Sequence, residues 1–313
     1  MRQIRVPFVL WLFIVAILVN LFLQPNFLLP VTINNNLRVL LPLILVAAGQ
    51  AVVILAGGID ISAGAIVSIV NAFLATRIGL NGDPGTAALM MALALLAGMA
   101  FGAINGFFVA ILRLQPIITT YATSFLFAGL ALLILPNPGG GMPSSFTKFY
   151  HDTMPLGLPL AFYVIALVML AWYGLRQARY GRYLFAVGGK ADAAFQTGVP
   201  VSTIQFSTYV ISGLMSAFGG IAMTLLTGSG NAQIGDPLTL SAITAVVIGG
   251  TALRGGTGGI GGAIIGAIVL GLFRNIVSFA NIATWWQTFV NAAIIVLALA
   301  MPGLIRLLRR GST

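Results

Sequence analysis

Long apolar runs, separated by short polar or glycine-rich breaks, follow one another along almost the whole chain. A helix rises 1.5 Å per residue, so about twenty apolar residues cross the roughly 30 Å hydrocarbon core of a bilayer. The runs are continuous and do not alternate with polar residues, which indicates helices and disfavours a membrane barrel. We therefore expect an all-α polytopic membrane protein in which residues 1–313 form a single transmembrane domain. The rule predicts about ten spans (eight to ten), near residues 6–23, 38–56, 62–79, 87–112, 117–136, 159–175, 203–228, 240–253, 259–279 and 285–303.

The first strong break is Gly57-Gly58-Ile59-Asp60-Ile61-Ser62-Ala63-Gly64, which lies between two apolar runs. A carboxylate at bilayer depth costs roughly 2.5–3.5 kcal/mol, so the position of Asp60 needs a compensating role. Paired glycines allow positive φ and close helix approach, while Asp60 and Ser62 can hydrogen-bond nearby peptide groups or cap the next helix. Two interpretations stay open, a functional bend and a turn with an N-cap.

A second glycine-rich break, Gly249-Gly250-Thr251-Ala252-Leu253-Arg254-Gly255-Gly256, lies at the end of the run 240–253. This run is short for a full span, and we expect a re-entrant or broken helix here. If it pairs with its neighbour as a re-entrant hairpin, two crossings disappear and the predicted sides of the two termini stay the same.

Glycines at the same four-residue spacing in two different runs predict an internal repeat. Gly98, Gly102 and Gly106 recur at every fourth residue in one run, as do Gly258, Gly262 and Gly266 in another, and Asn105 or Asn275 overlaps or follows each set. We expect two halves of five spans each that enter the bilayer from opposite sides, the inverted repeat found in many transporters. The alternative is ordinary close packing, because small residues at this spacing are common in membrane bundles.

Two loops between the spans are substantial. The first, about 137–158, is rich in proline and glycine and carries Lys148, His151 and Asp152; it is expected outside, as a connector or a partner contact. The second, about 176–200, is expected inside, where 190–197 can form two helical turns closed by Gly198 and stopped by Pro200. This short helix either docks against a partner or rests on the lipid headgroups.

The distribution of basic residues supports this placement of the two loops. With the N-terminus inside, as an uncleaved first span, eleven of the fifteen basic residues fall inside and four outside, in agreement with the positive-inside rule. Both termini are then expected in the cytoplasm. The eleven are Arg2, Arg5, Arg113, Arg176, Arg179, Arg182, Lys190, Arg254, Arg306, Arg309 and Arg310; the four are Arg38, Arg77, Lys148 and Arg274.

The amino-acid composition excludes several classes of protein function. The chain is 59% hydrophobic and 6% charged, has a mean hydropathy of +1.06 and contains no glutamate, unlike a soluble domain. The net charge of +10 does not indicate nucleic acid, because the basic residues are scattered singly at the ends of apolar runs. One histidine and no cysteine leave no metal, thiol or acid–base constellation, so we expect neither an enzyme nor a cofactor site. The stretch 256–261 fits G-x-G-x-x-G but follows a membrane run instead of a strand, and there is no P-loop.

Taken together, the motifs resemble the permease subunits of bacterial sugar ABC importers of the ribose/galactose/xylose class. The first break looks like the family's Gly-Gly-Ile-Asp-Leu-Ser-Val-Gly signature, with Ile61 and Ala63 as departures. The stretches 180–198 and 240–256 resemble its ATPase-contacting segment and its second glycine motif, and Trp286-Gln287 is also similar. Thr239 stands where many relatives have glutamate.

The resemblance implies a dimeric pore in the bacterial inner membrane, a separate cytoplasmic ABC ATPase that uses the ATP, and a periplasmic sugar-binding protein. It assigns a translocation or gate role to Gly57, Gly58, Asp60, Ser62, Gly64, Asn105, Gly249, Gly250, Thr251, Gly255 and Gly256. It assigns ATPase coupling to Gly181, Arg182, Gly188, Gly189, Ala193, Ala194 and Gly198. Open alternatives are an ABC permease for an autoinducer, nucleoside or amino acid, a secondary transporter or channel with Asp60 as ion-coupling carboxylate, and a membrane-embedded enzyme.

Overall fold

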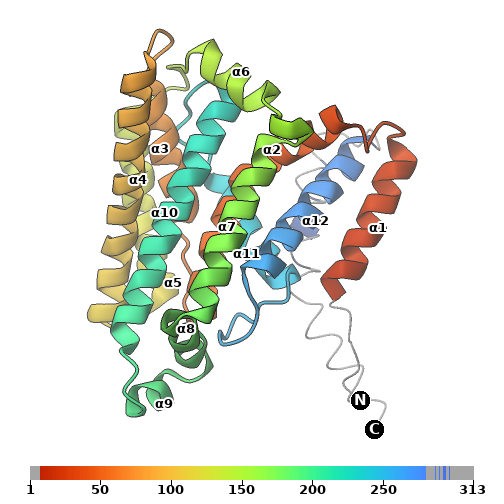
Figure 1. The fold of residues 1–313 in the computed structure, drawn as a ribbon. Coiled ribbons are helices and arrows are strands. Elements are labelled where there is room, and N and C mark those ends of the chain that lie inside the picture. The colour runs from red at the N-terminus through yellow and green to blue at the C-terminus, as the bar shows by residue number, and fades with distance from the viewer. Residues whose placement is uncertain (1–7, 280–285, 287–288, 290–291, 294–295, 297–313) are drawn as a thin grey trace.

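A computed structural model describes residues 8–279, together with 286, 289, 292–293 and 296. Within these residues the chain is helical and has no strand (Figure 1). Most of the predicted run 285–303, the first seven residues and the arginines after 303 lie outside the described residues.

Within the described part of the chain, six helices are long and apolar enough to span a membrane, which bears out the prediction of an all-α polytopic membrane protein. They are α2 (Pro30–Leu55), α4 (Pro84–Gly106) with its π-helical continuation η1 (Phe107–Ile111), α5 (Pro116–Ile134), α7 (Leu160–Gln177), α10 (Val201–Thr227) and α12 (Ile260–Phe279). Three apolar helices are shorter: α1 (Phe8–Leu23), α3 (Ala63–Arg77) and α11 (Asp236–Ile248). The remaining helices are α6 (Ser144–Asp152), η2 (Pro155–Gly157), α8 (Arg179–Gly189) and α9 (Ala191–Gln196).

The bundle has two distinct ends, one carrying α6 and the other α8 and α9 (Figure 1). At the α6 end, Arg38 near the start of α2 donates to the carbonyl of His151 (3.1 Å), and the His151 ring contacts the Leu226 carbonyl at the end of α10 (3.1 Å). At the other end, α2 finishes beside α8, and α9 leads directly into α10. Helices α2 and α10 therefore run in opposite directions.

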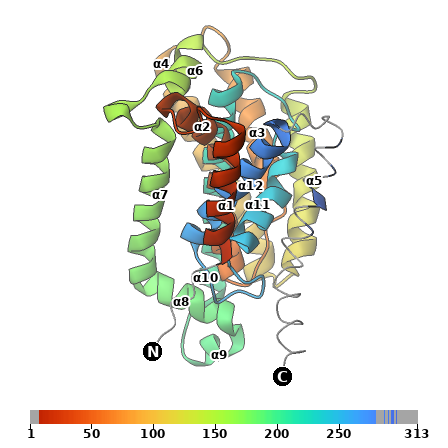
Figure 2. The same cartoon turned by 90° about the vertical axis from the view of Figure 1, so that its right-hand side faces the viewer.

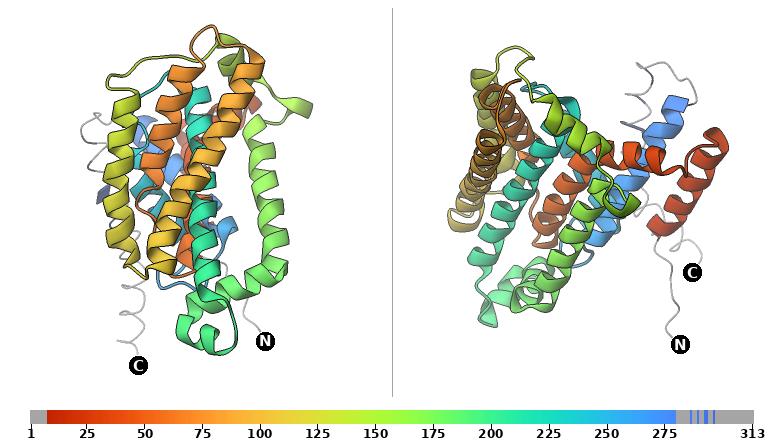
Figure 3. Two further views of the ribbon diagram at one scale, coloured as in Figure 1. Left: turned by 90° about the vertical axis from the view of Figure 1, so that its left-hand side faces the viewer. Right: turned by 45° about the horizontal axis from the view of Figure 1, so that its top comes forward.

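Helix α2 forms the centre of the bundle and α7 its edge. In the most apolar stretch of each helix, 83% of the residues of α2 are buried, against 11% for α7. Figure 2 shows α7 along one side of the molecule, and Figure 3 shows α3, α4, α5 and α10 side by side. The exposed sides of α4, α5 and α7 are apolar, as expected for surfaces that face lipid.

Helices α2 and α3 match α10 and α11 in length and in their contacts. Helix α2 has 26 residues and α10 has 27, α3 has 15 and α11 has 13, and each pair is joined by a non-helical break. The two pairs meet reciprocally: Gly64 N–H donates to Thr239 Oγ1 (3.0 Å), and Gly235 N–H donates to Ser68 Oγ (2.9 Å). Both relations have the same sequence offset of 171, from 64 to 235 and from 68 to 239.

This geometry adds one relation that the sequence did not predict and corrects another. The structural counterpart of the break at 57–64 is the segment 228–235, whereas the glycine stretch 249–256 lies between α11 and α12. The two glycine triads are also not equivalent. Gly98, Gly102 and Gly106 pack on α10, whereas Gly262 and Gly266 pack on α11 and Gly258 precedes α12.

The predicted run 240–253 is a short helix, as expected for a broken span. Helix α11 has 13 residues, a length of about 20 Å. Its first residues follow a non-helical segment that lies against α3: Asn231 N–H donates to Asn71 Oδ1 (2.7 Å), and Gly235 packs on Gly64. The break therefore lies at the beginning of α11 as well as at its end.

Candidate functional site

Asp60 is fully buried between α2 and α3, and hydroxyl groups hold both of its carboxylate oxygens. One oxygen accepts from Ser62 N–H (3.0 Å) and Ser62 Oγ (2.7 Å), and the other accepts from Ser212 Oγ of α10 (2.8 Å). None of the described basic residues forms an ion pair with it. Three donors compensate part of the cost of burying the carboxylate, and they fix the turn that begins α3.

The network around Asp60 extends into α4 and α5. The Asn105 amide donates to Ser62 Oγ (2.7 Å), and Thr123 Oγ1 donates to Asn105 Oδ1 (2.6 Å). Thr120 Oγ1 accepts from Ile61 N–H (3.0 Å), which satisfies a peptide group that no helix satisfies. Helices α4, α5 and α10 thus converge on the first break.

Gln50 on α2 completes the enclosure from the remaining side. With its amide oriented to satisfy both groups, it donates to the Asp60 carbonyl (3.0 Å) and accepts from the Asp60 N–H (3.2 Å). Of the predicted gate residues, Asp60, Ser62 and Asn105 are therefore brought together. Sequence reasoning missed Gln50, Ser212 and the two threonines of α5, whose only signal was a polar residue inside an apolar run.

The counterpart break at 228–235 has a polar centre of its own. Asn71 on α3 donates to Thr224 Oγ1 (3.0 Å) and to the Ser229 carbonyl (3.1 Å), and its Oδ1 accepts from Asn231 N–H. Sequence reasoning did not single out these residues, because their partners lie more than 150 positions away. Each break therefore receives at least one side chain from the other helix pair, Ser212 of α10 at the first break and Asn71 of α3 at the second.

The predicted gate and coupling residues meet at a backbone junction formed by Leu55, Gly57, Gly188, Gly255 and Gly256, here called the glycine junction. Gly256 N–H donates to the Leu55 carbonyl (3.0 Å). A Cβ atom on Gly188 of α8 would overlap that carbonyl and would lie 2.6 Å from Gly256 N, and one on Gly255 would lie 2.8 Å from Gly57 N. The end of α2, the stretch before α12 and helix α8 therefore touch through backbone alone.

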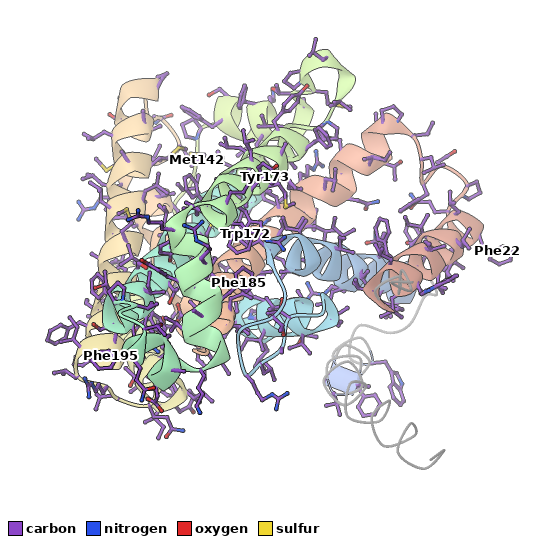
Figure 4. All side chains as sticks on the ribbon, turned by 60° about the horizontal axis from the view of Figure 1, so that its bottom comes forward. Phe22, Met142, Trp172, Tyr173, Phe185 and Phe195 are labelled. Carbon is purple, nitrogen blue, oxygen red and sulfur yellow. The ribbon has the colours of Figure 1, made fainter. Side chains whose placement is uncertain are left out.

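The other predicted coupling residues divide into buried and exposed positions. Gly181 and Ala194 are buried within the chain itself, so neither presents its surface to a partner. Gly198 ends α9 with a φ of 82°, as a C-terminal cap. Phe195 is 70% exposed, and Figure 4, which views this end of the bundle, shows it at the edge.

Several predicted positions are neither buried nor at the junction. Ala193 and Gly250 are exposed, a Cβ on Gly189 would meet nothing within 4 Å, and Arg182 donates to the Gln177 carbonyl (3.2 Å). Thr251, in contrast, is buried and accepts from Gly259 N–H (3.2 Å), which closes the loop before α12. Gly249 packs against Gly262 of α12.

The described residues contain no group of three His, Cys, Asp or Glu side chains that could hold a metal ion. The polar centre is a hydroxyl and amide network around one carboxylate. Such a network can hold irregular backbone at membrane depth, where each unsatisfied peptide group would cost several kcal/mol.

The sequence pattern of the family described as "Branched-chain amino acid transport system / permease component" matches residues 32–299. The chain belongs to this permease family. It is a subunit of an ABC transporter and is not itself an enzyme, as expected. The match includes both breaks, the glycine junction and α8–α9.

Individual members of the family are similar over most of their length. The ribose import permease protein RbsC of Escherichia coli (strain K12) is 34% identical over 286 residues, covering 88% of this chain and 87% of that protein. RbsC of Bacillus subtilis (strain 168) is 35% identical over 299 residues (94% and 91%). The galactose/methyl galactoside import permease protein MglC of Escherichia coli (strain K12) is 31% identical over 308 residues (93% and 92%). No solved structure gave a match.

Proposed function

We propose that this permease forms the translocation pathway for a monosaccharide of the ribose/galactose/xylose class, delivered by a periplasmic binding protein and driven by a separate ATPase. The similarity to ribose and galactose import permeases over about nine-tenths of the chain supports the sugar. The chain itself binds no cofactor, and ATP is used by the partner. The family description names branched-chain amino acids, so such an amino acid is the second candidate.

The end carrying α8 and α9 faces the cytoplasm in this proposal. Basic residues gather there: Arg176, Arg179, Arg182 and Lys190 lie in or beside α8, and Arg113 lines a cleft together with α9. Such a bias marks the cytoplasmic side of an inner-membrane protein. Segment 176–200 is then the coupling loop, 137–158 is the periplasmic loop, and both termini are cytoplasmic.

Helix α9 is the ATPase contact. Its exposed surface carries Asp192, Ala193 and Phe195, and the cleft beside it is lined by Arg113, Asp192, Phe195 and Gln205 among others. An exposed aromatic ring beside a cleft of mixed polarity is suited to a protein partner. Movement of α9 and α8 would reach both the first break and the stretch before α12 through the glycine junction.

The two matched helix pairs form an inverted repeat, and the pathway follows the face of α11. Asp236 and Gln233 are exposed there, beside Gly235. Gly235 contacts Ser68 of α3, and Ser68 lies nine residues before the end of that helix at Arg77. This places Gly235 about 13 Å along the helix axis from that end. Polar side chains directed at lipid are costly at this depth, so an aqueous pathway shared with a second permease copy is the better environment. Their groups can exchange hydrogen bonds with sugar hydroxyls.

Co-purification from membranes of the native host tests the assembly. The tagged chain should bring with it an ATPase with two nucleotide-binding halves, and mass spectrometry would identify a homodimer or a heterodimer of permeases. Recovery of the chain alone, in a detergent in which a known ABC importer keeps its ATPase, would contradict the proposal. Competition of labelled ribose uptake by galactose, xylose and leucine then separates the two substrate classes.

A further inference from the structure

An apolar groove separates α7 from the centre of the bundle. Its cavity volume is about 260 Å³, and it is lined by apolar side chains of α2, α7, α10 and α12. Those that define its length are Val164, Leu167, Ala171 and Leu175 of α7, and those that form its floor include Met215 and Phe218 of α10. An apolar groove that opens at membrane depth is accessible to an acyl chain.

The length of the groove matches one leaflet. From Val164 to Leu175 the helix rises about 16 Å, and half of a hydrocarbon core is about 15 Å. The groove ends toward α8 and α9, so the matching leaflet is the one at that end. A second copy of this chain would not be restricted to the depth of a single leaflet, as a lipid acyl chain is.

A second cavity, of mixed polarity, continues the groove at its α8 end. Trp172 lines both spaces, and the second cavity is completed by Tyr173, Arg176 and the glycines near the start of α12, among others. The guanidinium of Arg176 lies 5.9 Å from the ring centre of Phe185, and the Phe185 ring lies tilted beside Trp172 with the ring centres 6.4 Å apart. Figure 4 labels Trp172, Tyr173 and Phe185 at this place.

The charge at the mouth of the groove favours an anion. Neither space is lined by an acidic side chain, and Arg176 lines the second cavity. Aromatic side chains at this height are typical of the membrane–water interface, and one basic residue near an anionic surface contributes about 1 kcal/mol of attraction. A phosphate group beside Arg176 would place its acyl chain directly in the groove.

We propose that an anionic phospholipid of the leaflet at the α8–α9 end binds here, with one acyl chain between α7 and α10 and its phosphate at Arg176. Bound in this way, the lipid fills the space between α7 and the bundle. Because α7 continues into α8, the lipid would stabilise the position of the helix that reaches the glycine junction.

The test uses the full-length chain in two sets of phosphatidylcholine liposomes. Each set contains the same small fraction of a lipid with a photoreactive group on its acyl chain, which is phosphatidylglycerol in one set and phosphatidylcholine in the other. After illumination, mass spectrometry locates the labelled residues. We expect label concentrated on α7 and α10 at the groove, and more of it from phosphatidylglycerol. Even labelling of all lipid-facing helices by both lipids would overturn the proposal.

Two matched pairs of variants sharpen the result. Ala171→Trp fills the groove and should remove its label, whereas Ala166→Trp, on an exposed part of α7 outside the groove, should not. Arg176→Gln should lower the preference for phosphatidylglycerol by about fivefold, and Arg179→Gln should leave it unchanged. Equal label in the two alanine variants, or crosslinks between two copies through α7, would refute the acyl site; an unchanged preference in Arg176→Gln would refute the phosphate contact.

Discussion

Replacing Gly188 with alanine tests whether the glycine junction joins α8 to the two membrane breaks. In an ordinary helix the change would stabilise the chain by about 1 kcal/mol. Here the new Cβ would overlap the Leu55 carbonyl and lie 2.6 Å from Gly256 N. Because a tolerable C···O contact is about 3.3 Å, α8 would have to move away by more than about 1 Å.

The cost follows from what that movement disrupts. Overpacking of this kind costs about 1–3 kcal/mol, and loss of the hydrogen bond from Gly256 to Leu55 (3.0 Å) would add about 0.5–1.5 kcal/mol. These terms exceed the gain in helix propensity, so a net destabilisation of about 1–3 kcal/mol is expected. The larger consequence is functional, since a displaced α8 no longer holds both breaks.

Gly189→Ala is the matched control, because it lies next in the same helix and its Cβ would meet nothing within 4 Å. We expect Gly188→Ala to lower the apparent Tm in detergent and to abolish stimulation of the ATPase by the loaded binding protein, with Gly189→Ala at or above wild type in both assays. If the two variants have the same Tm and the same stimulated ATPase rate, the junction does not transmit movement.

Three further substitutions test separate parts of the account. Asp60→Ala should leave buried hydroxyl donors without acceptors, which costs about 1–3 kcal/mol of stability for each donor and should reduce the yield of folded protein. Asp60→Asn should keep much of the uptake. If Asp60→Asn keeps the Tm but loses all uptake, Asp60 is an ion-coupling group. Phe195→Ala should weaken co-purification of the ATPase without changing the Tm, and Leu156→Ala, equally apolar and exposed at the other end, should not; equal recovery would exclude α9 as the contact. Gly102→Ala should lower the Tm, because its Cβ would lie 2.9 Å from a backbone carbon of α10, while Gly129→Ala should not, since nothing lies within 4 Å there; equal Tm values would mean that α4 and α10 can separate at little cost.

The sequence predicted the positions of the helices well, because apolar runs of membrane length are a local property. Run 203–228 became α10 (Val201–Thr227), and run 259–279 became α12 (Ile260–Phe279). The short helix expected at 190–197 is α9, which ends before Gly198 as its capping residue requires. Breaks at Gly57-Gly58 and at 249–256 were also found from local composition.

Contacts between distant segments were not predictable in the same way. The donors to Asp60 include Ser212, 152 residues away, and only the packing of α10 on α2 and α4 brings it there. The reciprocal pairing of Gly64 with Gly235 depends on backbone geometry that the two dissimilar sequences reach separately. The burial of Ala194 likewise depends on how α9 packs against the bundle, which the local sequence does not specify.

Uptake of a radiolabelled monosaccharide into proteoliposomes that contain the co-purified complex tests the central claim most directly. The account predicts uptake that requires ATP on the ATPase side and the loaded binding protein on the other, and that continues when proton and sodium gradients are collapsed. Uptake that proceeds without ATP and follows an imposed ion gradient would contradict it.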